Sequence, residues 1–135
     1  MKILQSIVNA ILAHSQGELP YEACGYLAGN NGVATNFYAL TNTDKAADHF
    51  TMDPKEQFAA MKEMREHGLD LLAVYHSHPD TPARPSAEDV RLAFDPNVSY
   101  VIISLADSER VVKSFRICKG TVSPEDIEII AKNQP

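Results

Sequence analysis

The sequence predicts an α/β fold in which a single mixed β-sheet is flanked by helices. Two runs of strand length, 69–75 and 99–105, have the nearly continuous apolar composition of strands that are buried on both faces. Two segments with helical periodicity, 2–16 and 53–68, precede them. The chain has 135 residues, of which 44% are hydrophobic and 22% charged, so we expect one globular domain that spans residues 1–135.

The helix and the hairpin expected at the start of the chain are predicted by patterns of neighbouring residues. Residues 2–16 place their apolar side chains on one helical face, and Gly17 suits the C-terminal end of that helix. The small apolar residues 24–28 predict a buried strand, in which Gly25 indicates a close approach of another backbone or side chain. The turn signal Asn30-Asn31-Gly32 joins this strand in a hairpin to a second strand, which ends at Leu40.

A polar loop over 41–48 and a short strand over 49–52 are expected next. They lead into the clearest helix start of the chain, Asp53-Pro54-Lys55-Glu56, where Asp53 is the N-cap and Pro54 the first helical residue. Gly68 ends this helix and the central apolar strand follows.

The second half continues with a helix and two strands, expected at 87–94, 99–105 and 111–118. A turn is expected at 107–109. The tail from Ser123 is ambiguous: Ser123-Pro124-Glu125-Asp126 has the form of a helix start, whereas the isoleucines of 127–130 fit a strand equally well.

Composition excludes several classes of function. The chain has 12 Lys and Arg against 18 Asp and Glu, a formal net charge of −6, which argues against a nucleic-acid partner. No apolar run approaches the roughly 20 residues that span a bilayer, and no signal peptide is recognisable, so we expect no membrane association. The two cysteines, Cys24 and Cys118, need no disulfide, and a reducing cytoplasmic location is expected.

The residues that can carry chemistry gather after the central strand. His76 and His78 are two positions apart at its end, so their side chains point to the same face. Asp89 follows after a proline-rich loop. Two imidazoles and one carboxylate, with a fourth position open for water, form the pattern of a catalytic zinc site, in which the metal lowers the pKa of that water.

An ordinary structural interpretation stands beside this one. Ser86-Ala87-Glu88-Asp89 is also a helix capping box, and a single histidine is usually without a functional role. The complete pattern His-x-His-x7-Ser-x-x-Asp should arise by chance on the order of 10⁻⁴ times in a chain of this size. The combination therefore favours the metal site, and Ser86 and Asp89 can serve both purposes.

Hydrolysis also needs a general base and a donor for the developing oxyanion. Glu22, at the entrance of the first buried strand, is the candidate base, although a glutamate beside a proline is most often a solvated surface residue. Glu88 is the competitor, but it is about 100° around the helix from Asp89 and should point elsewhere. Ser86 is then free to donate a hydrogen bond to the oxyanion.

These residues resemble a known family. Glu22 together with His76-x-His78-x7-Ser86-x-x-Asp89 looks like the JAMM motif of the MPN-domain metalloproteases, and Asn42 and Phe50-x-x-Asp53-Pro54 are similar to further landmarks of that family. The resemblance covers nearly the whole chain and extends to the short prokaryotic members. It implies an MPN/JAB1-like fold of cytidine-deaminase-like architecture, zinc bound by His76, His78 and Asp89, Glu22 as the base, and Ser86 at the oxyanion.

The resemblance also implies a substrate class. Its prokaryotic members cleave peptide or isopeptide bonds after the C-terminal glycine of ubiquitin-like proteins, including small sulfur carriers, and a carrier with a Gly-Gly tail is the expected partner. Two alternatives stay open: a non-catalytic MPN-like binding module, and a zinc amidase that acts on a small molecule.

Overall fold

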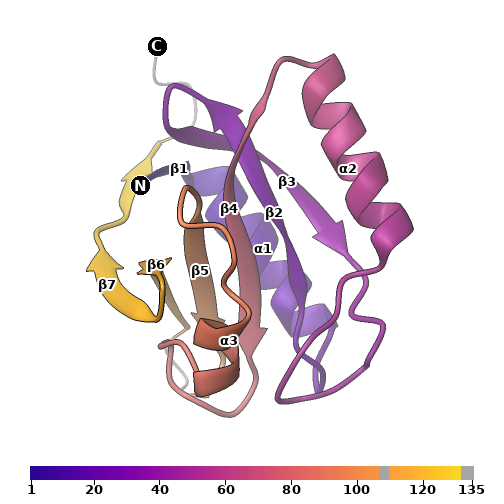
Figure 1. Ribbon diagram of the computed structural model, residues 1–135, viewed down its shortest axis with the longest axis vertical. Helices are drawn as coiled ribbons and strands as arrows, with labels where there is room; N and C mark the ends of the chain where they lie inside the picture. Colours follow the sequence, from indigo (N-terminus) through magenta and orange to yellow (C-terminus); the bar gives the residue numbers. More distant parts are fainter. Residues whose placement is uncertain (107–109, 132–135) are drawn as a thin grey trace.

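A curled mixed sheet of eight strands forms the body of the protein, and this computed structural model describes residues 1–106 and 110–131 (Figure 1). In chain order the elements are β1 (Lys2–Leu4), α1 (Gln5–Gly17), β2 (Cys24–Asn30), β3 (Val33–Leu40), α2 (Pro54–Glu66), β4 (Asp70–His78), α3 (Ala87–Arg91), β5 (Ser99–Ser104), β6 (Val111–Cys118), β7 (Thr121–Glu125) and β8 (Glu128–Ile130). The α/β class with flanking helices is confirmed.

The strand order explains the curl of the sheet. The order is β7-β6-β5-β4-β2-β3-β1-β8, so β7 and β8 lie at opposite edges of the sheet. Only Asp126 and Ile127 separate these two strands along the chain. The edges must therefore approach one another, and the terminal amino group of Met1 in fact contacts the carbonyl of Asp126 there.

The site is built on the centre of this sheet. β4 pairs with β2 in antiparallel and with β5 in parallel orientation, and the register places His76 opposite Cys24 of β2 and Ile102 of β5. Interior strands of a sheet are held by hydrogen bonds on both sides, which makes β4 a rigid support for the side chains that it presents.

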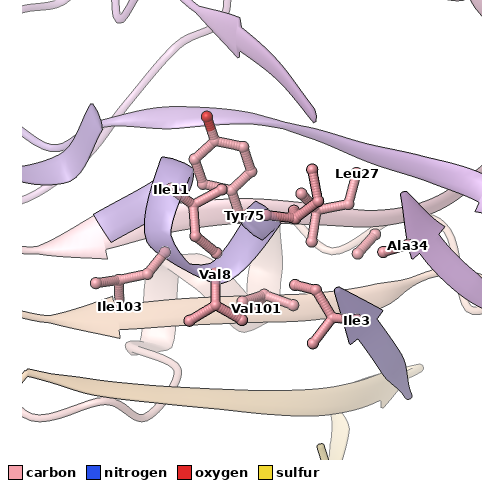
Figure 2. Close-up of a cluster of buried hydrophobic side chains, with 10 residues drawn as sticks. Ile3, Val8, Ile11, Leu27, Ala34, Tyr75, Val101 and Ile103 are labelled. Carbon is pink, nitrogen blue, oxygen red and sulfur yellow. The ribbon is translucent and has the colours of Figure 1, made fainter. Parts of the chain in front are cut away.

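The two faces of β4 have different neighbours. Tyr75 is fully buried in the cluster that α1 forms with the sheet through Ile3, Val8 and Ile11 (Figure 2). On the other face α2 packs over β2 and β3, and Val90 of α3 packs over β5 and β6. Because strand side chains alternate, His76 is directed to the face that carries α2 and α3.

Gly25 lies where the sheet permits no side chain. A Cβ atom added to this residue would overlap the carbonyl oxygen of Tyr38 on β3 and the ring of Tyr75 on β4. The close approach expected from the sequence is confirmed, and the buried Tyr75 ring fills the space that the glycine leaves.

Four local expectations need correction or completion. Residues 2–4 form a strand instead of the first helical turn, because they pair with β3 and β8. Residues 49–52 form no strand and contribute only an isolated bridge between Asn42 and Met52. α3 ends at Arg91, before the Asp95-Pro96 step. The ambiguous tail forms two strands, β7 and β8, whereas the turn at 107–109 lies outside the described residues.

The helix starts were easier to predict. The side chain of Asp53 accepts a hydrogen bond from the backbone of Lys55, with Pro54 in the first turn, as the sequence indicated. In the described ranges, no helix has both the length and the apolar character that a membrane crossing requires.

Candidate active site

Three of the predicted site residues meet at the C-terminal end of β4. His76 and His78 are buried, and Asp89 reaches them from α3. The two Nε2 atoms are 3.1 Å apart, and each lies 3.1 Å from Oδ2 of Asp89. Two imidazole nitrogens and one carboxylate oxygen thus converge on one point, which is the donor set of a transition-metal site.

The hydrogen bonding of His78 fixes which of its nitrogens is free. Nδ1 lies 2.9 Å from the carbonyl oxygen of Pro82, and a carbonyl can only accept, so Nδ1 carries the proton. In the neutral ring, Nε2 then presents a lone pair towards the carboxylate oxygen of Asp89. Two acceptors this close require a cation between them, either a proton or a metal ion.

His76 is oriented differently. Its ring stacks on Phe50, with centroids 4.9 Å apart and an angle of 30° between the planes. Phe50 lies in the loop before α2, so this loop supports the metal-ligand candidate from the side. From the sequence, Phe50 could be recognised only as part of the family pattern, and its contact with His76 was not predicted.

Asp89 serves the helix cap and the cluster with the same oxygen. Its Oδ2 accepts a hydrogen bond from the backbone N–H of Ser86 at 2.9 Å, and Ser86 Oγ accepts one from the backbone N–H of Asp89 at 3.0 Å. Burial alone would raise the pKa of Asp89, but the contacts with His76 and His78 reverse this and hold the pKa well below its ordinary value. Asp89 is therefore an anion in the folded protein.

The electrostatics of His78 agree with a site that attracts a cation. Burial by itself lowers the pKa of His78, whereas the contacts with Asp89 and the Pro82 carbonyl raise it, and the net result is a raised pKa. The nearby anion favours positive charge at His78, and a divalent cation would be favoured by the same anion.

Glu22 is buried just before β2, with 3% of its surface exposed. Among the described residues, its Oε1 atom has no hydrogen-bond partner. Burial raises the pKa of Glu22 to about 8, and the positive charge on His78 opposes this rise. A carboxyl group with a pKa near neutrality can both take up and release a proton under physiological conditions.

The backbone around Glu22 is held firmly. Ser77 donates its backbone N–H to the carbonyl of Ala23 at 3.0 Å and accepts the N–H of Ala23 on its hydroxyl at 2.8 Å. Glu22 itself donates its N–H to the carbonyl of Ala46 at 2.8 Å. The bonds between Ala23 and Ser77 continue the antiparallel pairing one residue beyond Cys24 and His76, and the next position brings Glu22 alongside His78.

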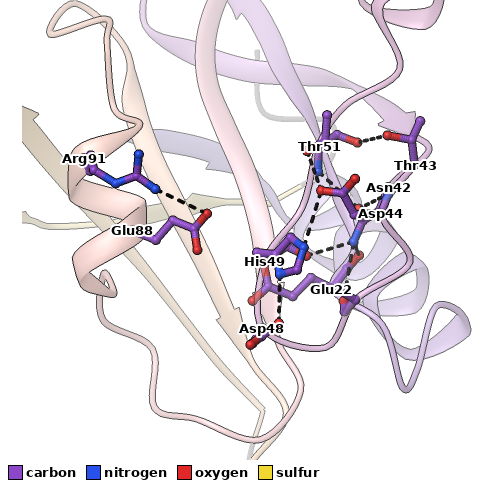
Figure 3. A network of polar contacts seen from close by, with 10 residues as sticks. Glu22, Asn42, Thr43, Asp44, Asp48, His49, Thr51, Glu88 and Arg91 are labelled. Atoms are coloured by element: carbon purple, nitrogen blue, oxygen red, sulfur yellow. Dashed lines mark hydrogen bonds and ion pairs between the residues drawn. The ribbon is translucent and has the colours of Figure 1, made fainter.

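Asn42 is the residue that organises the loop beside Glu22. Its buried amide group donates to the carbonyls of Glu22 and His49, each at 3.1 Å, and its oxygen accepts the backbone N–H of Thr51 (Figure 3). No role for Asn42 could be predicted from the sequence beyond its place in the family pattern, because these hydrogen-bond partners come together only in the folded loop.

Glu88 is not part of the converging group, but it lines a cavity next to it and contacts Arg91 at 3.7 Å. The expectation that this side chain points elsewhere was therefore wrong in part. In Figure 3 Glu88 lies across from the loop that carries His49 and Asp48. The cavity between these walls has a volume of about 280 Å³.

Comparison with known proteins places this arrangement in a family. The sequence profile described as prokaryotic homologs of the JAB domain matches residues 4–118. The chain belongs to this family. A CysO-cysteine peptidase from Mycobacterium tuberculosis is 34% identical to this JAB domain over 131 residues, which are 95% of this chain and 90% of the relative. A probable TtuB-protein conjugate cleaving protease from Thermus thermophilus is 36% identical and covers 66% of this chain and 60% of its own.

Solved structures agree with the fold. The solution structure of protein DSY2949 from Desulfitobacterium hafniense is 47% identical, with a TM-score of 0.89 over 97% of this chain and 93% of the other. A JAB1/MPN domain protein from Archaeoglobus fulgidus, 21% identical, matches with a TM-score of 0.68 over 96% and 99% of the two chains. The MPN/JAB1-like fold is confirmed, and the peptidase relatives place this JAB domain among the hydrolases.

Proposed function

We propose that this JAB-domain protein is a zinc-dependent peptidase or isopeptidase. It hydrolyses the amide bond after the C-terminal glycine of a ubiquitin-like or sulfur-carrier protein, in the reducing cytoplasm that its two free thiols, Cys24 and Cys118, suit. The observation that carries the proposal is the convergence of His76, His78 and Asp89 beside a buried, unpartnered glutamate.

The residues present fit a zinc ion. His78 offers an Nε2 lone pair because Nδ1 is engaged by Pro82, and Asp89 is ionised. Three protein ligands leave one coordination position open, which distinguishes a catalytic from a structural zinc site. When bound, zinc would lower the pKa of water and polarise the scissile carbonyl.

The remaining steps belong to the chain's own groups. Glu22 takes a proton from the attacking water and delivers it to the leaving amine, a shuttle that suits a carboxyl group whose pKa is raised by burial. The Ser86 hydroxyl accepts from Asp89, so its own proton is free to be donated to the carbonyl oxygen of the substrate as negative charge develops there. The hydrogen bond from the Ala23 N–H to the Ser77 hydroxyl and the one from the Asn42 side-chain amide to the Glu22 carbonyl keep Glu22 in position.

The test separates the base from the metal ligands. Glu22→Gln should retain zinc and lose hydrolysis of a Gly-Gly-linked conjugate by at least about 100-fold, as is typical for loss of a general base. His78→Ala should lose both zinc and activity. Full activity of Glu22→Gln would refute the assigned base.

Two alternatives make different predictions. A non-catalytic binding module would bind a carrier protein yet release nothing, and would hold less than about half a zinc ion per chain after gentle purification. An amidase for small molecules would retain zinc and the dependence on Glu22 but leave every Gly-Gly conjugate intact. The peptidase relatives favour the first proposal over both.

A further inference from the structure

The cavity beside His76 has no assigned occupant. We propose that it receives a bulky apolar side chain of the substrate, carried by the third residue from the end of the carrier's tail, immediately before the Gly-Gly pair. This inference rests on the proposed function, because it concerns the same substrate, but it can fail while that function stands.

The position of the cavity indicates which residue enters it. His76 and Asp89 line one part of it, and Val74, on the same strand face as His76, lines another. Val74 precedes His76 by two positions on the same face of β4, a separation of about 7 Å at roughly 3.3 Å per residue. Two extended glycine residues also span about 7 Å. A Gly-Gly pair beside His76 therefore brings the preceding side chain to the level of Val74.

The walls favour an apolar occupant because their polar groups already have partners. The hydroxyl of Tyr26 donates to Gln57 Oε1 at 2.9 Å, and Gln57 Nε2 donates to the carbonyl of Met52 at 3.1 Å. The hydroxyl of Tyr100 donates to the carbonyl of Asp95 at 2.7 Å. A buried apolar side chain would leave none of these groups without a partner, so the hydrophobic gain is not offset by desolvation.

Two apolar residues stand at the rim. Phe94 is 82% exposed and Leu92 is 43% exposed, and both line the cavity. The bonds between Tyr100 and Asp95 tie this rim segment to β5, so Leu92 and Phe94 have a fixed support. An occupied cavity would cover these side chains, which gives a physical reason for apolar groups in so exposed a place.

The size and charge of the cavity narrow the ligand further. A volume of about 280 Å³ has room for one large side chain. Glu88 and Asp95 stand beside the opening, and the described lining residues include no lysine or arginine. A carboxylate, either on a side chain or on a free amino acid, is therefore disfavoured in this cavity. A lysine or arginine next to the apolar residue in the carrier's tail is favoured, because it would lie near the acidic residues at the opening.

The experiment uses three synthetic peptides that end in X-Gly-Gly, where X is Leu, Ala or Asp, each joined by an amide bond to a fluorogenic amine. With the zinc-loaded protein we expect kcat/KM to be 10- to 200-fold higher for Leu than for Ala, the range that an apolar pocket provides for such a difference. The Asp peptide should be the poorest substrate. Val74→Phe fills the cavity and should bring the Leu-to-Ala ratio close to 1.

The matched control is Val33→Phe, which makes the same change on β3, where neither the residue nor its cross-strand partners Lys2 and Asn30 line the cavity, and should keep the wild-type ratio. If Val74→Phe fails to fold, Val74→Ala enlarges the cavity instead and should shift the preference from Leu towards Phe at X. Binding of the uncleaved peptides to Glu22→Gln gives a second readout, in which the Leu peptide should bind at least 10-fold more tightly than the Ala peptide.

The outcomes separate the two proposals. Hydrolysis of the Leu and Ala peptides at equal rates overturns the pocket and leaves the peptidase intact. The same holds if Val74→Phe and Val33→Phe behave alike. If neither these peptides nor protein conjugates with Gly-Gly linkages are cleaved, the proposed function fails and the pocket assignment fails with it.

Discussion

Glu22 should destabilise the metal-free protein, and Glu22→Gln should remove that cost. Burial raises the pKa of Glu22 from an ordinary 4.5 to about 8, so between these values the folded state binds a proton that the unfolded state has released. The free energy of unfolding therefore falls as pH rises through this window, by about 1.4 kcal/mol per pH unit at most. At pH 7 the upper limit is about 3 kcal/mol, and because the protein relaxes around a buried charge we expect about 1–2 kcal/mol.

The assay is urea unfolding of chelator-treated protein at pH 5 and pH 7.5. The stability of Glu22→Gln relative to the wild type should increase by about 1–2 kcal/mol between the two pH values. The difference also contains the coupling of Glu22 to His78 and Asp89, because these groups lie close to it, so it reports the titration of Glu22 within this site. Glu66→Gln, an exposed change on α2, controls for the loss of one negative charge.

A difference that stays constant between pH 5 and pH 7.5 would refute the reasoning, because it would mean that Glu22 titrates alike in the folded and the unfolded chain. The assay must be done without metal. A bound divalent cation near His78 would favour the ionised carboxylate and narrow the pH window. If Glu22→Gln is more stable than the wild type and also inactive, Glu22 serves catalysis and lowers the stability of the fold.

Further predictions concern the support of the site. Gly25→Ala should destabilise the protein by about 3 kcal/mol or more in urea unfolding, because the new methyl group overlaps Tyr38 and Tyr75, whereas Gly17→Ala, which meets no atom within 4 Å, should change stability by less than about 1 kcal/mol. Asn42→Ala should keep its zinc but lower kcat about 10- to 100-fold, because Glu22 loses the amide that holds its carbonyl; unchanged kcat would show that the loop needs no such anchor. Removal of metal with a chelator should abolish hydrolysis, and added zinc should restore it; activity that survives complete zinc removal would contradict the proposed function.

Much of the fold could be predicted because its signals are local. The cap at Asp53-Pro54, the hairpin turn at Asn31-Gly32 and the apolar run of β4 depend on neighbouring residues only, and all three are present in the structure. Predictions failed where distant pairing decides. Residues 2–4 carry helical periodicity, yet β3 and β8 bind their backbone groups as a strand.

The site residues divide in the same way, into positions that neighbouring residues determine and surroundings that distant segments determine. The spacing of His76 and His78 on one strand determines that they share a face, and the capping box determines where Asp89 stands on its helix. The sequence could therefore nominate the metal-ligand candidates before any coordinates existed. It could also nominate Glu22, from its place at the entrance of a buried strand and from the resemblance to a family, but nothing local showed that this glutamate is buried.

Only the tertiary structure decided what surrounds these groups. The antiparallel pairing of β2 with β4 brings Glu22 beside His78, and burial then moves its pKa towards neutrality. The folded loop gives Asn42 and Phe50 their contacts with Glu22 and His76. Spacing along a strand or helix is set by backbone geometry, which a sequence contains, whereas desolvation and packing depend on which distant segments lie nearby, and only the folded chain brings those together.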